Sequence, residues 1–227
     1  MEQLHGAGRQ DERAISTGCS PIDELLPQGG LLPGTLVEWL SEHPGSGAGM
    51  LAMMSARQAC SEGKVLVIMD RARQFYPPAI TAWGIDLERL LVLRPESESD
   101  ELWALDQVLR SPSVGAVWAP LARIDVREFR RLQLAAESGG TIGLLIRPAH
   151  VRFEPSWAET QFFVHPTASP TGWRFNVEVT RSRGGISGRS VEFEINYQTG
   201  MAEPLTQRHD SHPLHSLAKL ASTAASG

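Results

Sequence analysis

The chain has 227 residues, a formal net charge of −5 at neutral pH, and 41% hydrophobic and 21% charged residues. This composition is typical of a globular protein with a buried core and excludes a chain that is disordered throughout. The negative charge also argues against a protein that coats nucleic acid by bulk electrostatics, because such domains are usually basic.

The sequence gives no sign of export or of membrane insertion. The first residues lack the pattern of a signal peptide, and no apolar run approaches the roughly eighteen residues of a membrane span. We therefore expect a cytoplasmic protein that does not contact a membrane. Two cysteines, Cys19 and Cys60, are too few for a zinc set or a disulfide framework and are expected to be small buried side chains.

We expect one core domain over residues 15–205, between an N-terminal arm (1–14) and a C-terminal tail (206–227). The tail has little apolar surface to bury and is predicted to be mobile. It carries three regularly spaced histidines, His209, His212 and His215. Without supporting carboxylates, they indicate a solvated tail rather than a metal site, and we expect neither a metal nor a cofactor.

The middle of the chain alternates between two kinds of pattern. Short, continuously apolar segments predict parallel strands covered on both faces, at residues 64–70, 90–93, 114–118 and 141–146. Helical patterns precede or separate them, at residues 50–60, 78–83, 100–110 and 125–138. Strands that alternate with helices predict an α/β fold with a mainly parallel sheet and right-handed crossovers.

The pattern changes after residue 151. Polar and apolar residues alternate at 161–164, 173–180 and 190–197, which is typical of antiparallel strands with one wet face. The sequence therefore predicts an antiparallel hairpin extension at one edge of the sheet.

A glycine-rich loop lies near residue 45. A working phosphate loop reads G-x-x-x-x-G-K-[ST], where backbone N–H groups cradle the phosphates, Lys neutralises them and the hydroxyl binds magnesium. Here Gly45, Ser46 and Gly47 are followed, if one residue is inserted into the loop, by Ala48 and Gly49 at the Lys and hydroxyl positions. A nucleotide at this degenerate loop would be held by backbone amides and the helix dipole alone.

The residues before the loop are informative as well. Residues 15–39 contain an S-T-G segment, an Asp at position 23, a G-G-x-x-x-G turn from Gly29 to Gly34 and a Val-Glu strand ending near Glu38. In order and spacing this segment resembles the opening of the RecA-like ATPase core. The resemblance implies a RecA-like, mainly parallel sheet flanked by helices.

The same resemblance identifies two more positions where ATPase chemistry is missing. In RecA-like enzymes the strand after the first helix ends in an I-D-A-E-type segment whose Glu activates water, but here Asp70 is followed by Ala72 and Arg73. The next strand normally ends in an Asp that binds magnesium through water, and here we expect Ala119 at that position. Phosphoryl transfer needs both groups. The chain is therefore predicted to be a pseudo-ATPase, with an active DNA-dependent ATPase as the alternative.

Two arginines in the predicted hairpin match a functional pair of the family. Arg181 and Arg183 correspond to two Lys residues that reach the ATP of a neighbouring RecA subunit. Arginine keeps the charge and binds phosphate or carboxylate bidentately. The resemblance implies a retained interface with a protein partner, the alternative being an ordinary solvated surface.

RecA proteins carry a mobile DNA-binding loop before the hairpin. The corresponding segment here is short and contains Arg147, Arg152, Phe153 and Trp157, cations and aromatic rings that could contact single-stranded DNA weakly. An ordinary connection is the alternative. A further basic cluster on the helix near residues 123–131 is expected to be a solvated face.

A RecA-like core of this size, with little room for the polymerising helix and C-terminal domain of RecA, is similar to the bacterial ImuA family. The resemblance implies an accessory role in damage-induced translesion DNA synthesis, through contacts with RecA and/or polymerase-like mutagenesis proteins. A SulA-type inhibitor of cell division, which binds a tubulin-like GTPase, is the alternative.

Overall fold

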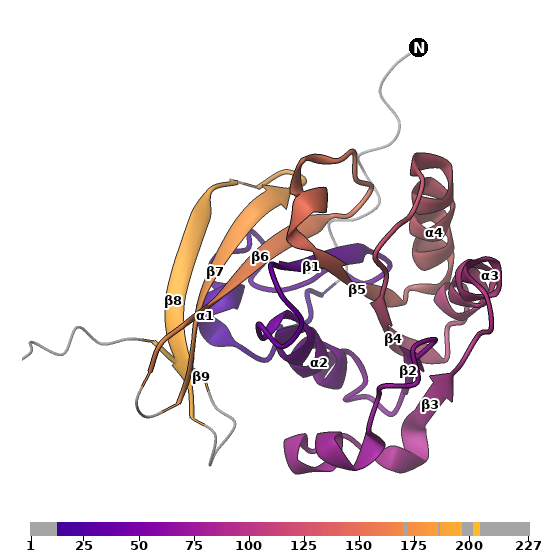
Figure 1. Ribbon diagram of the computed structural model, residues 1–227, viewed down its shortest axis with the longest axis horizontal. Helices are drawn as coiled ribbons and strands as arrows, with labels where there is room; N and C mark the ends of the chain where they lie inside the picture. Colours follow the sequence, from indigo (N-terminus) through magenta and orange to yellow (C-terminus); the bar gives the residue numbers. More distant parts are fainter. Residues whose placement is uncertain (1–12, 170–171, 186, 197–201, 205–227) are drawn as a thin grey trace, which may run out of the picture.

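The structure is a computed structural model that describes residues 13–169, 172–185, 187–196 and 202–204 (Figure 1). The predicted tail with its three histidines, and all but the last two residues of the predicted arm, lie outside the described residues. None of the helices in the described ranges is long and apolar enough to cross a bilayer.

Within these ranges, nine strands form one sheet in the order β3-β2-β4-β5-β1-β6-β7-β8-β9. The strands are β1 Leu36–Ser41, β2 Val65–Met69, β3 Leu90–Leu93, β4 Val114–Pro120, β5 Ile142–Pro148, β6 Thr160–Thr167, β7 Trp173–Ser182, β8 Arg189–Ile195 and β9 Ala202–Pro204. Strands β1 to β6 pair in parallel, and β6 to β9 pair antiparallel. The predicted parallel sheet with an antiparallel extension is confirmed.

The α-helices are divided between the two faces of the sheet (Figure 1). They are α1 Ser20–Asp23, α2 Ala48–Ala59, α3 Glu98–Leu109 and α4 Val126–Gly139. Helix α2 packs into the core on one face, and α3 and α4 pack into a second core on the other. Ser97 and Asp125 are the N-cap residues of α3 and α4, and both residue types are favoured at that position. The Ser97 hydroxyl accepts a hydrogen bond from the Asp100 N–H, and the Asp125 carboxylate accepts hydrogen bonds from the N–H groups of Arg127 and Glu128.

One expectation about the elements is confirmed with a different helix type, and one was wrong. The helix expected at residues 78–83 is the 3₁₀ helix η1, Pro77–Trp83, which begins with two prolines that supply no backbone N–H groups for an α-helical turn. The first strand of the expected antiparallel extension, β6, is parallel to β1 and antiparallel only to β7. Its residues 160–164 are buried, because β6 still belongs to the covered part of the sheet.

The chain has two other 3₁₀ helices in the described ranges, η2 Leu87–Arg89 and η3 Ala149–Phe153. The second one lies in the connection between β5 and β6, residues 149–159, which we call the linker. Since all the parallel strands point the same way, the phosphate loop, the linker and the ends of β2 and β4 lie at one edge of the sheet.

Candidate functional site at the carboxyl edge of the sheet

The glycine-rich loop directly connects β1 to α2. Residues 42–47 form the connection and α2 begins at Ala48, so the loop is as long as the G-x-x-x-x-G span and needs no inserted residue. Glu42 therefore stands at the first glycine position, which corrects the register assumed from the sequence. Ala48 and Gly49 remain at the Lys and hydroxyl positions, in the first turn of α2.

The loop is closed on itself and against the sheet. The Ser46 hydroxyl donates to the His43 carbonyl over 2.5 Å, and Gly45 and Gly47 have left-handed φ angles of 84° and 94°. The Phe175 ring of β7 packs directly on Gly47: a Cβ there would lie 2.8 Å from Phe175 Cζ and closer still to Cε1. No side chain can be added at Gly47 without moving that ring.

A tryptophan occupies the space between the loop and β4. The Trp118 indole N–H donates to the Gly49 carbonyl over 3.0 Å, and a Cβ at Gly49 would lie 3.2 Å from Trp118 Cζ2. Ala119 instead lies on the opposite face of the sheet, in the core with α3 and α4. The assignment of Ala119 to the magnesium position was therefore wrong by one residue, because neighbouring strand residues point to opposite faces. Trp118 is the residue that faces the loop.

The end of β2 is organised by a carboxylate that has a structural role. Asp70 Oδ1 accepts hydrogen bonds from the N–H groups of Gln74 (2.7 Å) and Phe75 (3.1 Å), and Oδ2 accepts from Arg94 Nε (3.2 Å). The next residues, Ala72 and Arg73, are exposed and supply no carboxylate. Ala72 and Arg73, the two positions predicted to lack the water-activating acid, thus lie in a turn that is stabilised by the hydrogen bonds of Asp70.

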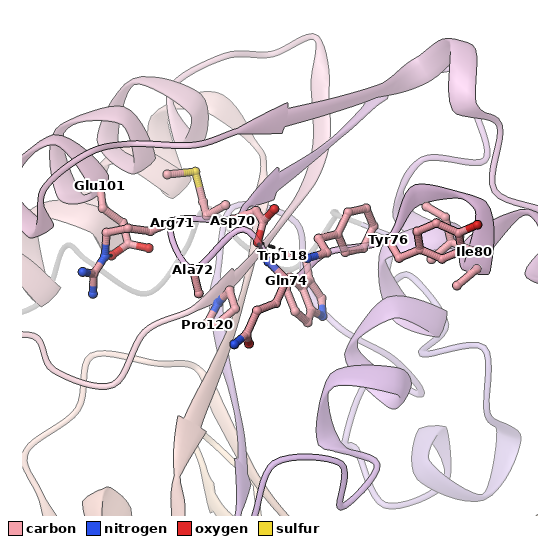
Figure 2. A pocket seen from close by; sticks show the side chains of 12 residues that line it. Asp70, Arg71, Ala72, Gln74, Tyr76, Ile80, Glu101, Trp118 and Pro120 are labelled. Carbon is pink, nitrogen blue, oxygen red and sulfur yellow. Dashed lines mark hydrogen bonds and ion pairs between the residues drawn. The ribbon is translucent and has the colours of Figure 1, made fainter.

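A cavity of about 400 Å³ opens at the ends of β2 and β4 (Figure 2). Figure 2 shows Arg71 and Glu101 at one end, Tyr76 and Ile80 at the other, and Trp118 and Gln74 between them. Sequence reasoning missed this cavity, since only its Asp70 to Ala72 wall matched a known motif. A second cavity of about 510 Å³, which shares Arg71 and Glu101 with the first, lies between the starts of α3 and α4 and the linker.

Arg147 cannot contact DNA as the sequence suggested. Its side chain is 1% exposed, and its guanidinium donates to Glu38 Oε1 (2.6 Å) and to the Leu121 carbonyl (3.2 Å). Glu38 is fully buried in β1 and also accepts from the Ser156 hydroxyl (2.7 Å) and from Gln161 Nε2 (2.8 Å). This buried network ties the linker to the sheet through Ser156.

The other candidate DNA contacts form a basic and aromatic surface. Arg152 pairs with Glu178 over 2.6 Å, and its guanidinium lies 5.8 Å from the ring of Phe153, which is 89% exposed. The guanidinium groups of Arg130 and Arg183 lie over the Trp157 ring, at 4.4 and 5.5 Å from its centroid.

Arg181 lies near this surface and donates to the Glu154 carbonyl of the linker over 3.2 Å. The structure therefore brings both hairpin arginines to the linker, together with Arg130 from the basic helix. Because its ring is already covered by guanidinium groups, Trp157 is a poor platform for stacking a base.

The described residues offer no metal site, and neither cysteine has a lowered pKa. No group of three or more His, Cys, Asp or Glu side chains among them is arranged to hold a metal ion. Burial raises the pKa of the Cys19 thiol to about 12 and that of Cys60 to about 11, so both stay protonated at neutral pH.

Comparison with known proteins identifies the fold. No protein-family model matches the chain. The crystal structure of the RadB recombinase superposes with a TM-score of 0.66 at 16% identity, covering 85% of this chain and 100% of that chain. The RecA protein of Chlorobium chlorochromatii (strain CaD3) is 33% identical over 117 residues, which are 52% of this chain and 33% of that protein. The chain spans about a third of that RecA sequence, and its fold is RecA-like, as the sequence predicted.

A different relative matches over most of its length. Protein ImuA of Caulobacter vibrioides (strain NA1000 / CB15N) is 26% identical in an alignment of 213 positions that covers 82% of this chain and 85% of that protein. The similarity to ImuA thus extends over most of both chains, whereas the similarity to RecA covers about half of this one.

Proposed function

We propose that this chain is an ImuA-type accessory protein of damage-induced mutagenesis that does not hydrolyse ATP. The observation that carries the proposal is the similarity to ImuA over most of both chains, combined with the state of the phosphate loop. A RecA-like fold by itself would not distinguish this role from others, because one fold supports many functions.

Three features of the carboxyl edge support the absence of hydrolysis. The first turn of α2 carries Ala48 and Gly49, which can neither neutralise phosphates nor hold magnesium. The Trp118 indole packs on Gly49, so a hydroxyl side chain at that position would meet the ring. The turn after Asp70 offers Ala72 and Arg73 in place of a water-activating acid.

The expected mode of action is contact with other proteins, RecA and/or a polymerase-like mutagenesis protein. The surface we favour is formed by Arg181 and Arg183, with Arg130 and Trp157 beside them. Its guanidinium groups fit an acidic surface or a nucleotide edge on a partner. Single-stranded DNA would bind there weakly, through charge more than through stacking.

The catalytic part of the proposal is tested with purified protein. We expect no phosphate release from MgATP above the buffer background, with or without single-stranded DNA. We also expect Ala48→Lys with Gly49→Thr to remain inactive, because Trp118 and the missing acid are unchanged. Turnover that co-purifies with the protein and is lost when residues 45–49 are altered would contradict the pseudo-ATPase proposal.

The cellular part is tested in the source organism. Deleting the gene should lower the frequency of mutations induced by DNA damage, and wild-type protein should restore it. A variant with Arg181→Ala and Arg183→Ala should fold but fail to restore mutagenesis, whereas Arg189→Ala, on the neighbouring strand, serves as the matched control. Unchanged mutagenesis in the deletion strain, together with filamentous cells on overproduction, would favour a SulA-type division inhibitor.

A further inference from the structure

The two cavities at the carboxyl edge form one surface feature, which we call the edge groove. They share Arg71 and Glu101, and their other walls come from the turn after β2, from η1, from the ends of β4 and from the starts of α3 and α4. The edge groove adjoins the phosphate loop through Trp118, which lines the first cavity and donates to the Gly49 carbonyl, so both features lie at one corner of the carboxyl edge. The two ends of the edge groove differ in their chemistry.

The first end of the edge groove is apolar and aromatic. It is lined by Phe75, Tyr76, Ile80 and Trp118, with Pro120 beside them. Tyr76 is 68% exposed, although it lies at the wall of a cavity (Figure 2). Covering such a ring with an apolar side chain would remove a large apolar area from water and stabilise a complex.

This end is badly suited to a nucleotide. Arg71 is the cation in its wall, and its guanidinium is already paired with Glu101 (2.8 Å) and Glu98 (3.5 Å). The Asp70 carboxylate is occupied by two backbone N–H groups and Arg94. A phosphate placed here would meet carboxylates without a free counter-charge.

The second end is acidic. Five carboxylates and two guanidinium groups line it, which gives a formal charge of −3: Glu98, Glu101, Asp125, Glu128 and Glu154 against Arg71 and Arg123. Asp125 caps α4, Arg71 pairs with both Glu101 and Glu98, and Glu154 lies 3.7 Å from Arg147, but the carboxylates that line this end still outnumber the guanidinium groups that line it. Charge complementarity therefore favours a cationic ligand group at this end.

We propose that the edge groove binds an extended segment of a protein partner that carries an apolar or aromatic side chain and a nearby Lys or Arg. The apolar side chain packs between Tyr76 and Trp118, and the cation lies against the Glu98 and Glu128 end. This inference rests on the proposed function, because the same corner must be free of nucleotide. It adds a second contact surface, opposite in charge to the one around Arg181 and Arg183.

The probe is a phage-displayed library of random peptides of about a dozen residues, selected against the immobilised full-length chain. Enriched peptides are then synthesised, and their Kd is measured by fluorescence anisotropy. We expect them to combine an aromatic or aliphatic residue with Lys or Arg. Tyr76→Ser, and separately Glu98→Lys with Glu128→Lys, should each raise the Kd about tenfold or more, the loss expected for one anchoring contact.

Two control variants match these changes elsewhere on the surface. Trp173→Ser removes an exposed aromatic ring from β7, and Glu192→Lys reverses an exposed charge on β8. Both should leave the Kd unchanged, and circular dichroism checks that all variants fold. Three results would each overturn the proposal. The selected peptides could bind the Tyr76→Ser variant as tightly as the wild-type protein, they could be acidic, or selection on the wild-type protein could enrich no peptides beyond those enriched on the Tyr76→Ser variant.

Millimolar MgATP is added as a competitor in a separate arm. Unchanged peptide binding supports both the edge groove and the loss of nucleotide binding. Displacement of the peptide by MgATP would overturn the proposed function, because it would show that nucleotide binds at this corner. If no peptide is selected and the protein does not bind MgATP either, only the edge groove is overturned.

Discussion

The packing of Phe175 on the phosphate loop leads to a prediction with an internal control. Gly45 and Gly47 both have left-handed φ angles, 84° and 94°, so an alanine at either position pays the same kind of backbone cost, about 1–2 kcal/mol. They differ in what surrounds them. A Cβ at Gly45 has no atom within 4 Å, whereas a Cβ at Gly47 overlaps the Phe175 ring.

The expected loss of stability follows from this difference. Gly45→Ala should lower the free energy of unfolding by about 1–2 kcal/mol. Gly47→Ala should lower it by about 2–5 kcal/mol, because overpacking a buried ring adds roughly 1–3 kcal/mol. Combining Gly47→Ala with Phe175→Leu should cost less than the sum of the two single changes, because the shorter side chain relieves the overlap.

Equilibrium unfolding in urea, followed by circular dichroism, measures all four variants against wild type. The midpoint should shift while the slope stays constant, since the area exposed on unfolding is unchanged. Equal losses for Gly45→Ala and Gly47→Ala, or strict additivity with Phe175→Leu, would refute the argument that β7 holds the loop closed.

Three further predictions concern the buried groups. Arg147→Met should lower the free energy of unfolding, measured in urea, by about 3–5 kcal/mol, because it leaves the Glu38 charge buried without its cation. Adding Glu38→Leu should recover part of this loss. A double variant that is less stable than Arg147→Met alone would contradict a stabilising ion pair. Cys19, which is buried, should react with a thiol reagent only after unfolding, whereas Cys60 is only half-buried and should react slowly in the native protein because its thiol stays protonated; rapid labelling of Cys19 near neutral pH would be inconsistent with its burial. Because burial raises the pKa of Cys19 from 9.0 to about 12, the unfolded state loses the thiol proton first, so stability should fall as pH rises from about 9 towards 12. That alkaline loss should be smaller in Cys19→Ala, and equal losses would show that another group is responsible.

The sequence predicted the elements of the fold well because their patterns are local. Continuous apolar runs identified β2 to β5, and β3 was predicted with the bounds it has, Leu90–Leu93. A continuously apolar run, however, does not indicate which of its side chains lie on the same face of the sheet. In β4 every residue from Val114 to Pro120 is apolar or glycine, so a shift of one residue selected Ala119 where Trp118 faces the loop.

The site was harder to predict because its contacts join distant parts of the chain. Arg147 follows the apolar run that was predicted as a strand, and it was expected to be exposed, since arginine is seldom buried without a partner; in the structure it lies within β5. Its partner Glu38 is 109 residues away, and no spacing rule connects them. The aromatic end of the edge groove likewise depends on how η1 packs, and 3₁₀ helices leave little periodic signal.

The attachment of the linker to the sheet fixes the shape of the basic surface in the protein on its own. Ser156 is bonded to Glu38, and Arg147 lies 3.7 Å from Glu154, so the basic surface is assembled before any partner arrives. Association then loses little conformational entropy, in contrast to a loop that orders only on binding. A surface fixed in this way needs no nucleotide-driven change of shape to reach its binding-ready form, which is the behaviour that the proposed function requires.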